Sequence, residues 1–187
     1  DRDFDLFLAP FDILGSIAHV IMLESAGLLT KKEKELLVKE LKEIYKATSP
    51  VHHSLFSIHR DVEDVHSQVE LLLTEKLGDI GKKIHSARSR NDQVLLDIKL
   101  FLRNELEQLV RSVQRLFELL QSQSEKYKDH LLPGYTHLQL AMPSSFGLWF
   151  GAYAEGLVDD VITLKAAYEV VNKNPLGSAA GYGSSFP

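Results

Sequence analysis

The sequence predicts an all-α protein, and two observations support this fold class. Apolar residues recur at helical spacing through most of the chain, and no run of alternating β-branched residues bounded by turns indicates a strand. The composition is that of a globular protein, with 44% hydrophobic and 25% charged residues among 187. We therefore expect a core that is built between packed helices.

Three helices are expected in the first part of the chain, near residues 12–27, 30–49 and 61–78. Thr30 and Glu33 form a capping-box pattern that opens the second of them. Gly27 and Gly78 are placed to end the first and the third. The sequence reads as a loop over residues 49–59. Together these segments predict a small helical domain over residues 1–88.

Two long helices are expected in the remainder, which we assign to a second domain over residues 89–187. One runs from about Asn91 to about Lys128, because apolar residues continue without a break at positions 94, 98, 102, 106, 109, 113, 116 and 120. Pro143 is well placed for the first turn of the other. A helix of about 38 residues is roughly 57 Å long, whereas a compact chain of this length is about 40 Å across. Other helices must therefore cover its apolar stripe.

Charge and composition exclude several classes of partner. The net charge is −5, so no sequence-wide basic surface exists to bind nucleic acid, and any anion must be bound by a local site. No apolar run is long enough to span a membrane. The chain has no cysteine, which excludes disulfides and thiolate chemistry and favours a cytoplasmic location. The spacing of His52, His53 and His59 matches no strong metal motif, and we expect no metal ion.

The densest polar stretch, residues 83–93, precedes the first long helix. It carries Arg88 and Arg90 among serines and the amide of Asn91. Such donors at a helix start, where backbone N–H groups are free, suit a carboxylate or a phosphate. The alternative is a solvated loop that ends in a helix cap.

A second polar stretch, residues 133–139, lies between the two long helices. Within it, His137 is the best acid/base candidate of the chain, because it stands among hydroxyl and amide groups and can exchange a proton near neutral pH. The alternative is a histidine that only forms hydrogen bonds within its loop.

Two segments, His-Ser-Ala-Arg-Ser-Arg-Asn-Asp-Gln at 85–93 and Gly-Tyr-Thr-His-Leu-Gln at 134–139, together resemble the paired signature of the argininosuccinate lyase family. The Glu-Asp-Val-His segment at 63–66 is similar to a further motif of that family. The family belongs to the fumarase/aspartase superfamily. This resemblance implies a small helical N-terminal domain followed by the first long helices of a superfamily-type bundle.

The resemblance also implies a reaction, the reversible elimination of arginine from argininosuccinate to leave fumarate by a carbon–nitrogen lyase without a cofactor. It assigns Ser89, Arg90 and Asn91 to recognition of substrate carboxylates, and Thr136 to the carboxylate on the fumarate side. It makes His137 the acid/base residue. Weaker candidates for substrate binding are Asp64 and His66.

One departure from the family pattern concerns a third signature, a glycine- and serine-rich loop with Met and Lys positions. Residues 183–187 resemble it only superficially, and we assign no catalytic serine there. The resemblance therefore implies an N-terminal fragment that is inactive alone, from a homotetramer with shared active sites. Alternatives are another lyase of the superfamily or a non-catalytic, crystallin-like protein with the same fold.

Overall fold

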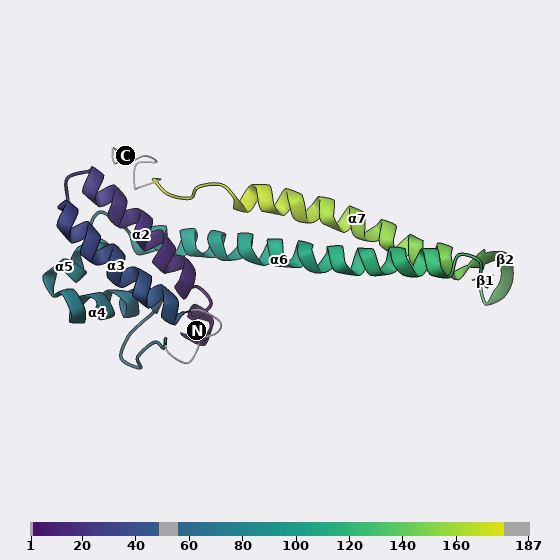
Figure 1. Ribbon diagram of the computed structural model, residues 1–187, viewed down its shortest axis with the longest axis horizontal. Coiled ribbons are helices and arrows are strands. Elements are labelled where there is room, and N and C mark those ends of the chain that lie inside the picture. The colour runs from purple at the N-terminus through teal and green to yellow at the C-terminus, as the bar shows by residue number, and fades with distance from the viewer. Residues whose placement is uncertain (1, 49–55, 178–187) are drawn as a thin grey trace. The chain divides into compact units, whose positions relative to one another are not determined.

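The computed structural model describes residues 2–48 and 56–177, which divide into two compact units (Figure 1). The first holds the described residues up to 101 together with 173–177, and the second is Leu102–Asn172. The described residues form seven α-helices, one short 3-10 helix and two strands, so the helical fold class is confirmed. The histidines at 52 and 53 and the segment 183–187 lie outside the described residues.

The first unit contains helices close to those that the sequence predicts. Thr30 caps the second as expected, since its Oγ1 accepts from the Glu33 N–H and the Glu33 carboxylate accepts from the Thr30 N–H. Gly27 and Gly78 adopt positive φ values of 76° and 60°, which L-residues with side chains rarely adopt. The elements are α1 (Arg2–Asp5), α2 (Ala9–Ser25), α3 (Lys31–Ala47), α4 (Val65–Leu77), α5 (Asp79–Lys82), η2 (Lys83–His85) and the first turns of α6 (Arg90–Lys126).

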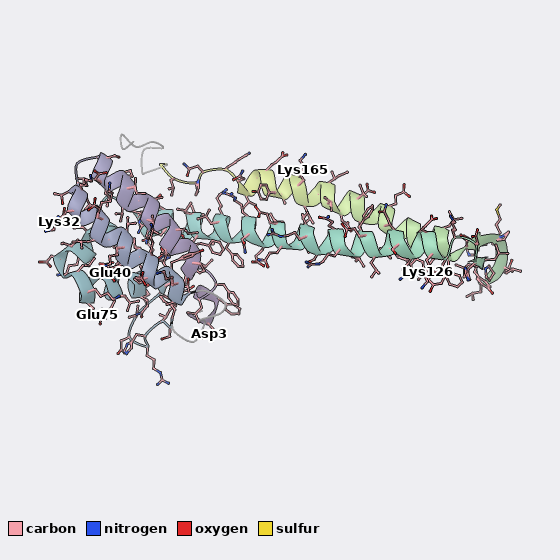
Figure 2. All side chains as sticks on the ribbon, in the orientation of Figure 1. Asp3, Lys32, Glu40, Glu75, Lys126 and Lys165 are labelled. Carbon is pink, nitrogen blue, oxygen red and sulfur yellow. The ribbon has the colours of Figure 1, made fainter. Side chains whose placement is uncertain are left out.

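A continuous hydrophobic core lies between α2, α3 and α4, which lie side by side in Figure 1. Charged side chains such as Lys32 and Glu75 project from the outside of these helices (Figure 2). The buried core residues are Ala9, Ile13, Val20, Leu23, Leu29, Leu37, Leu41, Ile44, Phe56, Val65, Val69, Leu73 and Ile84.

The second unit consists of α6 beyond residue 101, an antiparallel hairpin of β1 (Leu131–Thr136) and β2 (Gln139–Ser145), and α7 (Phe146–Val171). The hairpin corrects the expectation of no strands. Pro143 was expected in a first helical turn, but it pairs with Pro133 in the hairpin, and α7 begins after its N-cap Ser145. A two-stranded ribbon has only edge strands, where the missing N–H of proline is tolerated. For this reason proline did not distinguish strand from helix here.

Apolar side chains of α6 and α7, among them Leu106, Val110, Val161 and Leu164, line an open groove within the second unit. The two helices also carry exposed apolar residues, and charged side chains such as Lys126 and Lys165, which Figure 2 labels. Exposed fractions are 47% for Leu109, 47% for Leu116, 54% for Leu119 and 63% for Ile162. Among the described residues, no helix is long and apolar enough to cross a membrane.

Candidate active site

Helix α6 begins within the polar segment 83–93 that the sequence analysis identified. Ser89 caps the helix, because its Oγ accepts from the Asn91 N–H at 3.1 Å. In return, the Asp92 carboxylate accepts from the Ser89 N–H, also at 3.1 Å. The two bonds satisfy backbone donors as a capping box does. The side chain of Asn91 stands exposed beside the cap.

Arg90 links the start of α6 to the start of α4. Its Nη2 donates to Ser67 Oγ at 3.2 Å, and its Nε lies 3.4 Å from Asp64 Oδ2. Asp64 in turn caps α4 by accepting from the Ser67 N–H at 2.8 Å. Partial burial disfavours the charged form of Asp64, but the hydrogen bonds from Ser67 and the charge of Arg90 outweigh this and lower its pKa.

This arrangement places two helix N-termini and one guanidinium together. The side chain of Arg90 keeps 37% of its surface exposed, so donors remain open toward solvent. Backbone N–H groups at helix starts and an arginine are the groups that bind carboxylates most readily in proteins. Ser89, Arg90 and Asn91, which the sequence proposed, therefore form one region whose donors suit an anion, and Asp64 lies beside it as the carboxylate partner of Arg90.

His66 stands apart from this exposed region, with only 5% of its surface accessible. Its Nδ1 lies 2.8 Å from Asp12 Oδ1 and 3.6 Å from Asp97 Oδ2. Gln93 Nε2 donates to the same Asp12 oxygen at 3.4 Å. Burial, with a further contribution from Asp12, raises the pKa of Asp97 to about 8, although Arg88 acts in the opposite direction. We call Asp12, His66, Gln93 and Asp97 the buried cluster.

Three groups of the buried cluster could in principle hold a metal ion, since Asp12, His66 and Asp97 offer ligand atoms within 4.8 Å of one another. Among the described residues this is the one such group found. Its geometry favours protons, because 2.8 Å between Nδ1 of His66 and a carboxylate oxygen is the distance of an N–H···O hydrogen bond. In addition, Arg88 already supplies positive charge to both carboxylates.

Helix α2 supports the same region with a polar stripe that sequence reasoning missed. Arg88 Nη2 donates to Ser16 Oγ at 3.2 Å, and His19 Nε2 lies 2.8 Å from the Ser86 carbonyl oxygen. Burial and the charge of Arg88 lower the pKa of His19 to about 4, so its ring is neutral and donates to that carbonyl. The available signal was the spacing of Asp12, Ser16 and His19, four and three residues apart on an otherwise apolar helix.

The second predicted group lies at the tip of the hairpin in the second unit. Thr136 pairs with Gln139, which leaves His137 and Leu138 as a two-residue turn. Both have positive φ, 48° and 62°, as the tight turns of hairpins require. Residues with side chains are strained in this conformation, and such strain concentrates at functional sites. The His137 side chain is exposed at this tip.

The predicted site residues therefore fall in two places. Ser89, Arg90, Asn91 and Asp64 come together in the first unit, with His66 buried behind them, and Thr136 and His137 lie in the second. The expectation that both groups face one cleft in an assembled protein stays a prediction.

Comparison with known protein families identifies the class to which this fold and these groups belong. A family model described as lyase matches residues 7–186, and the chain belongs to this family. The chain is 65% identical over all 187 residues to an argininosuccinate lyase of Parabacteroides distasonis, and 64% identical to one of Bacteroides fragilis. It spans 41% of the length of both relatives.

Solved structures support the same fold. EDDS lyase in complex with formate matches 98% of this chain with a TM-score of 0.79 and 26% identity, and 35% of that protein is covered. A fumarate lyase:delta crystallin from Brucella melitensis matches 94% of this chain with a TM-score of 0.76, covering 42% of that protein. At 17% identity, this second likeness concerns the fold alone.

Proposed function

We propose that the protein acts as an argininosuccinate lyase, a carbon–nitrogen lyase that cleaves argininosuccinate reversibly into arginine and fumarate during arginine biosynthesis. The observation that carries this proposal is the 65% identity, over the whole chain, to a protein of that name. The anion-binding character of the region around Arg90 supports it, because the substrate is rich in carboxylates.

The proposed roles follow from what the elimination requires. A proton leaves a carbon beside a carboxylate, and negative charge then accumulates on that carboxylate. Ser89, Arg90 and Asn91 bind substrate carboxylates through the donors at the start of α6. Asp64 orients Arg90 by its contact with the guanidinium Nε. This chemistry needs no metal ion or cofactor.

In the same proposal the hairpin tip supplies the remaining groups. Thr136 binds the carboxylate on the fumarate side, and His137 transfers the proton. A turn exposed at the end of a hairpin is suited to enter a site on another copy of the chain. The exposed apolar faces of α6 and α7 favour such an assembly, which we propose to be a homotetramer in the cytoplasm.

The test of His137 is His137→Asn in the full-length protein, with fumarate release followed by ultraviolet absorbance. We expect kcat to fall about 10² to 10⁴-fold with little change in KM, as for the loss of a general acid or base. His130→Asn, at an exposed histidine just before the hairpin, is the matched control and should retain activity. Near-normal turnover of the His137 variant would remove this residue from the mechanism.

Arg90→Lys tests the anion site separately. We expect it chiefly to raise KM, because an ammonium group does not reproduce the planar two-point contact of a guanidinium. A folded wild-type protein that releases no fumarate would contradict the proposed activity and favour the crystallin-like alternative.

A further inference from the structure

The buried cluster joins three helices, two of which also carry the proposed anion site. Asp12 comes from α2, His66 from α4, and Gln93 and Asp97 from α6. Asp12 and Asp97 are each only 1% exposed, and one oxygen of each, Oδ2, has no hydrogen-bond partner. Buried polar groups are costly unless they are paired, so a cluster of this kind needs an explanation beyond packing.

The cluster is linked to the anion site through short stretches of helix. Gln93 and Asp97 stand three and seven residues after Arg90, on the inner face of the same helix. His66 stands two residues after Asp64. The contact of His66 with Asp12 therefore holds the start of α4, and the contact of Gln93 with Asp12 holds the start of α6. These two helix starts carry the pair of Arg90 and Asp64.

The charges of the groups around Asp97 indicate that the buried cluster holds a proton. The titratable groups that face Asp97 are Asp12 from α2, His66 from α4 and Arg88 from the segment before α6. Two carboxylates this close in a buried site repel each other when both are ionised. A proton on Asp97 relieves the repulsion and supplies a donor, and burial raises the pKa of this carboxyl to about 8.

We propose that Asp12, His66 and Asp97 are positioning residues for the substrate-binding pair Arg90 and Asp64, and that they act by retaining one proton on Asp97. This inference rests on the proposed lyase function. His66 then serves the substrate indirectly, from behind the site. When Asp97 loses its proton, repulsion from Asp12 loosens the contact between the starts of α4 and α6, and substrate affinity falls.

The first test compares Asp97→Asn, Asp97→Ala and wild type in the full-length protein, with KM for argininosuccinate measured from pH 6 to pH 9.5. An amide is neutral and close in shape to the protonated carboxyl. Asp97→Asn should therefore leave KM and kcat within about twofold at neutral pH and abolish the rise of KM on the alkaline side. Asp97→Ala should raise KM about tenfold or more at every pH, because it removes the donor beside Asp12 and leaves a cavity in its place. The matched control is Asp79→Asn, at an exposed carboxylate paired with Lys82 in the same unit.

A second readout does not depend on activity. Asp97 has a raised pKa in the folded protein, so its contribution to stability is largest at low pH and is lost as pH rises from about 4 to about 8. Asp97→Asn should remove this loss, so that the Tm of the variant falls less than that of wild type over this range. The measurement is thermal unfolding at a series of pH values.

The two readouts separate the possible failures. Parallel pH profiles of Tm for wild type and Asp97→Asn would overturn the proposal, whether or not the protein is a lyase. A shifted Tm profile with unchanged KM profiles would also overturn it, because the cluster would then be structural alone. Absence of fumarate release from wild type, together with the expected Tm profiles, would overturn the lyase function and with it the positioning role for that substrate.

Discussion

The two units of the chain differ in how they use apolar side chains. Among the described residues, 14 apolar side chains are buried, and all of them except Ala154 lie in the first unit. The second unit buries Ser145, Gly147 and Ala154, while Ile162 on α7 and four leucines of α6 remain 40% exposed or more. These leucines are Leu102, Leu109, Leu116 and Leu119. Soluble proteins rarely leave such stripes uncovered.

This difference indicates which contacts stabilise each unit. The first unit has a closed core that forms within one chain, and it carries its anion site on helix starts that this core supports. The second unit presents apolar faces that further helices must cover. The following predictions test this contrast, from the largest expected effect to the smallest.

Leu41→Ala should have the largest effect, because this side chain of α3 is fully buried in the closed core. The loss of the side chain and the cavity left behind should lower the free energy of unfolding by about 2–5 kcal/mol. Denaturant unfolding followed by circular dichroism measures it.

Leu119→Ala is the counterpart in the second unit, where the side chain is 54% exposed. For a dissociated chain we expect a change of about 0.5 kcal/mol or less, as for most surface substitutions. A loss as large as that of Leu41→Ala in the dissociated chain would contradict the contrast between the units.

Gly147→Ala should disturb a closely packed point of the second unit. A Cβ there would lie 2.5 Å from Lys128 Cα and 2.8 Å from the Ser124 carbonyl oxygen. Overpacking of this kind destabilises by about 1–3 kcal/mol. Gly156→Ala is the matched control in the same helix, since nothing lies within 4 Å of its added Cβ. It should stabilise by about 0.5–1 kcal/mol through helix propensity, and a destabilisation there would show that the site is packed.

His19 should make the first unit sensitive to acid. Its pKa is lowered to about 4 in the folded protein, so the unfolded chain binds more protons between pH 6.5 and pH 4. Stability should therefore fall as pH drops through this range, by up to about 1.4 kcal/mol per pH unit. His19→Gln should flatten the profile measured by denaturant unfolding. An unchanged acid slope would show that His19 is not the group responsible.

Removal of helix caps should have modest effects. Thr30→Ala removes two hydrogen bonds of Thr30 Oγ1, which accepts from the Glu33 N–H and donates to the Glu33 carboxylate, whereas Ser145→Ala removes a single bond that Ser145 Oγ accepts from the Leu148 N–H. We expect each to lower the free energy of unfolding by about 1 kcal/mol, with the larger loss for Thr30. Equal losses would mean that the bond from Thr30 Oγ1 to the Glu33 carboxylate contributes nothing.

Much of the fold could be predicted from local patterns. The capping box at Thr30 and the long periodicity of α6 were confirmed, because both signals lie within one helix. The predicted start of the third helix, near Asp61, was several residues early, since Asp64 is the residue that caps α4. The hairpin was missed because its strands are largely exposed on both faces, so no alternation of apolar and polar residues marks them.

The candidate site was only partly predictable, for a related reason. Ser89, Arg90 and Asn91 are adjacent in sequence, so composition alone singled them out. Asp12 and Asp97 meet only after the chain folds, 85 positions apart. A polar residue within an apolar periodicity is the only trace that such a contact leaves in the sequence.

The contrast between the units is tested most directly by hydrogen exchange of the full-length protein over a dilution series, with sedimentation velocity reporting the assembly at each concentration. We predict that amides of α2, α3 and α4 keep their protection when the assembly dissociates, because their core lies within one chain. Amides of α7 and of α6 beyond residue 102 should lose protection at the same step. Protection of α7 that persists in the dissociated chain, or equal loss in both units, would contradict this account.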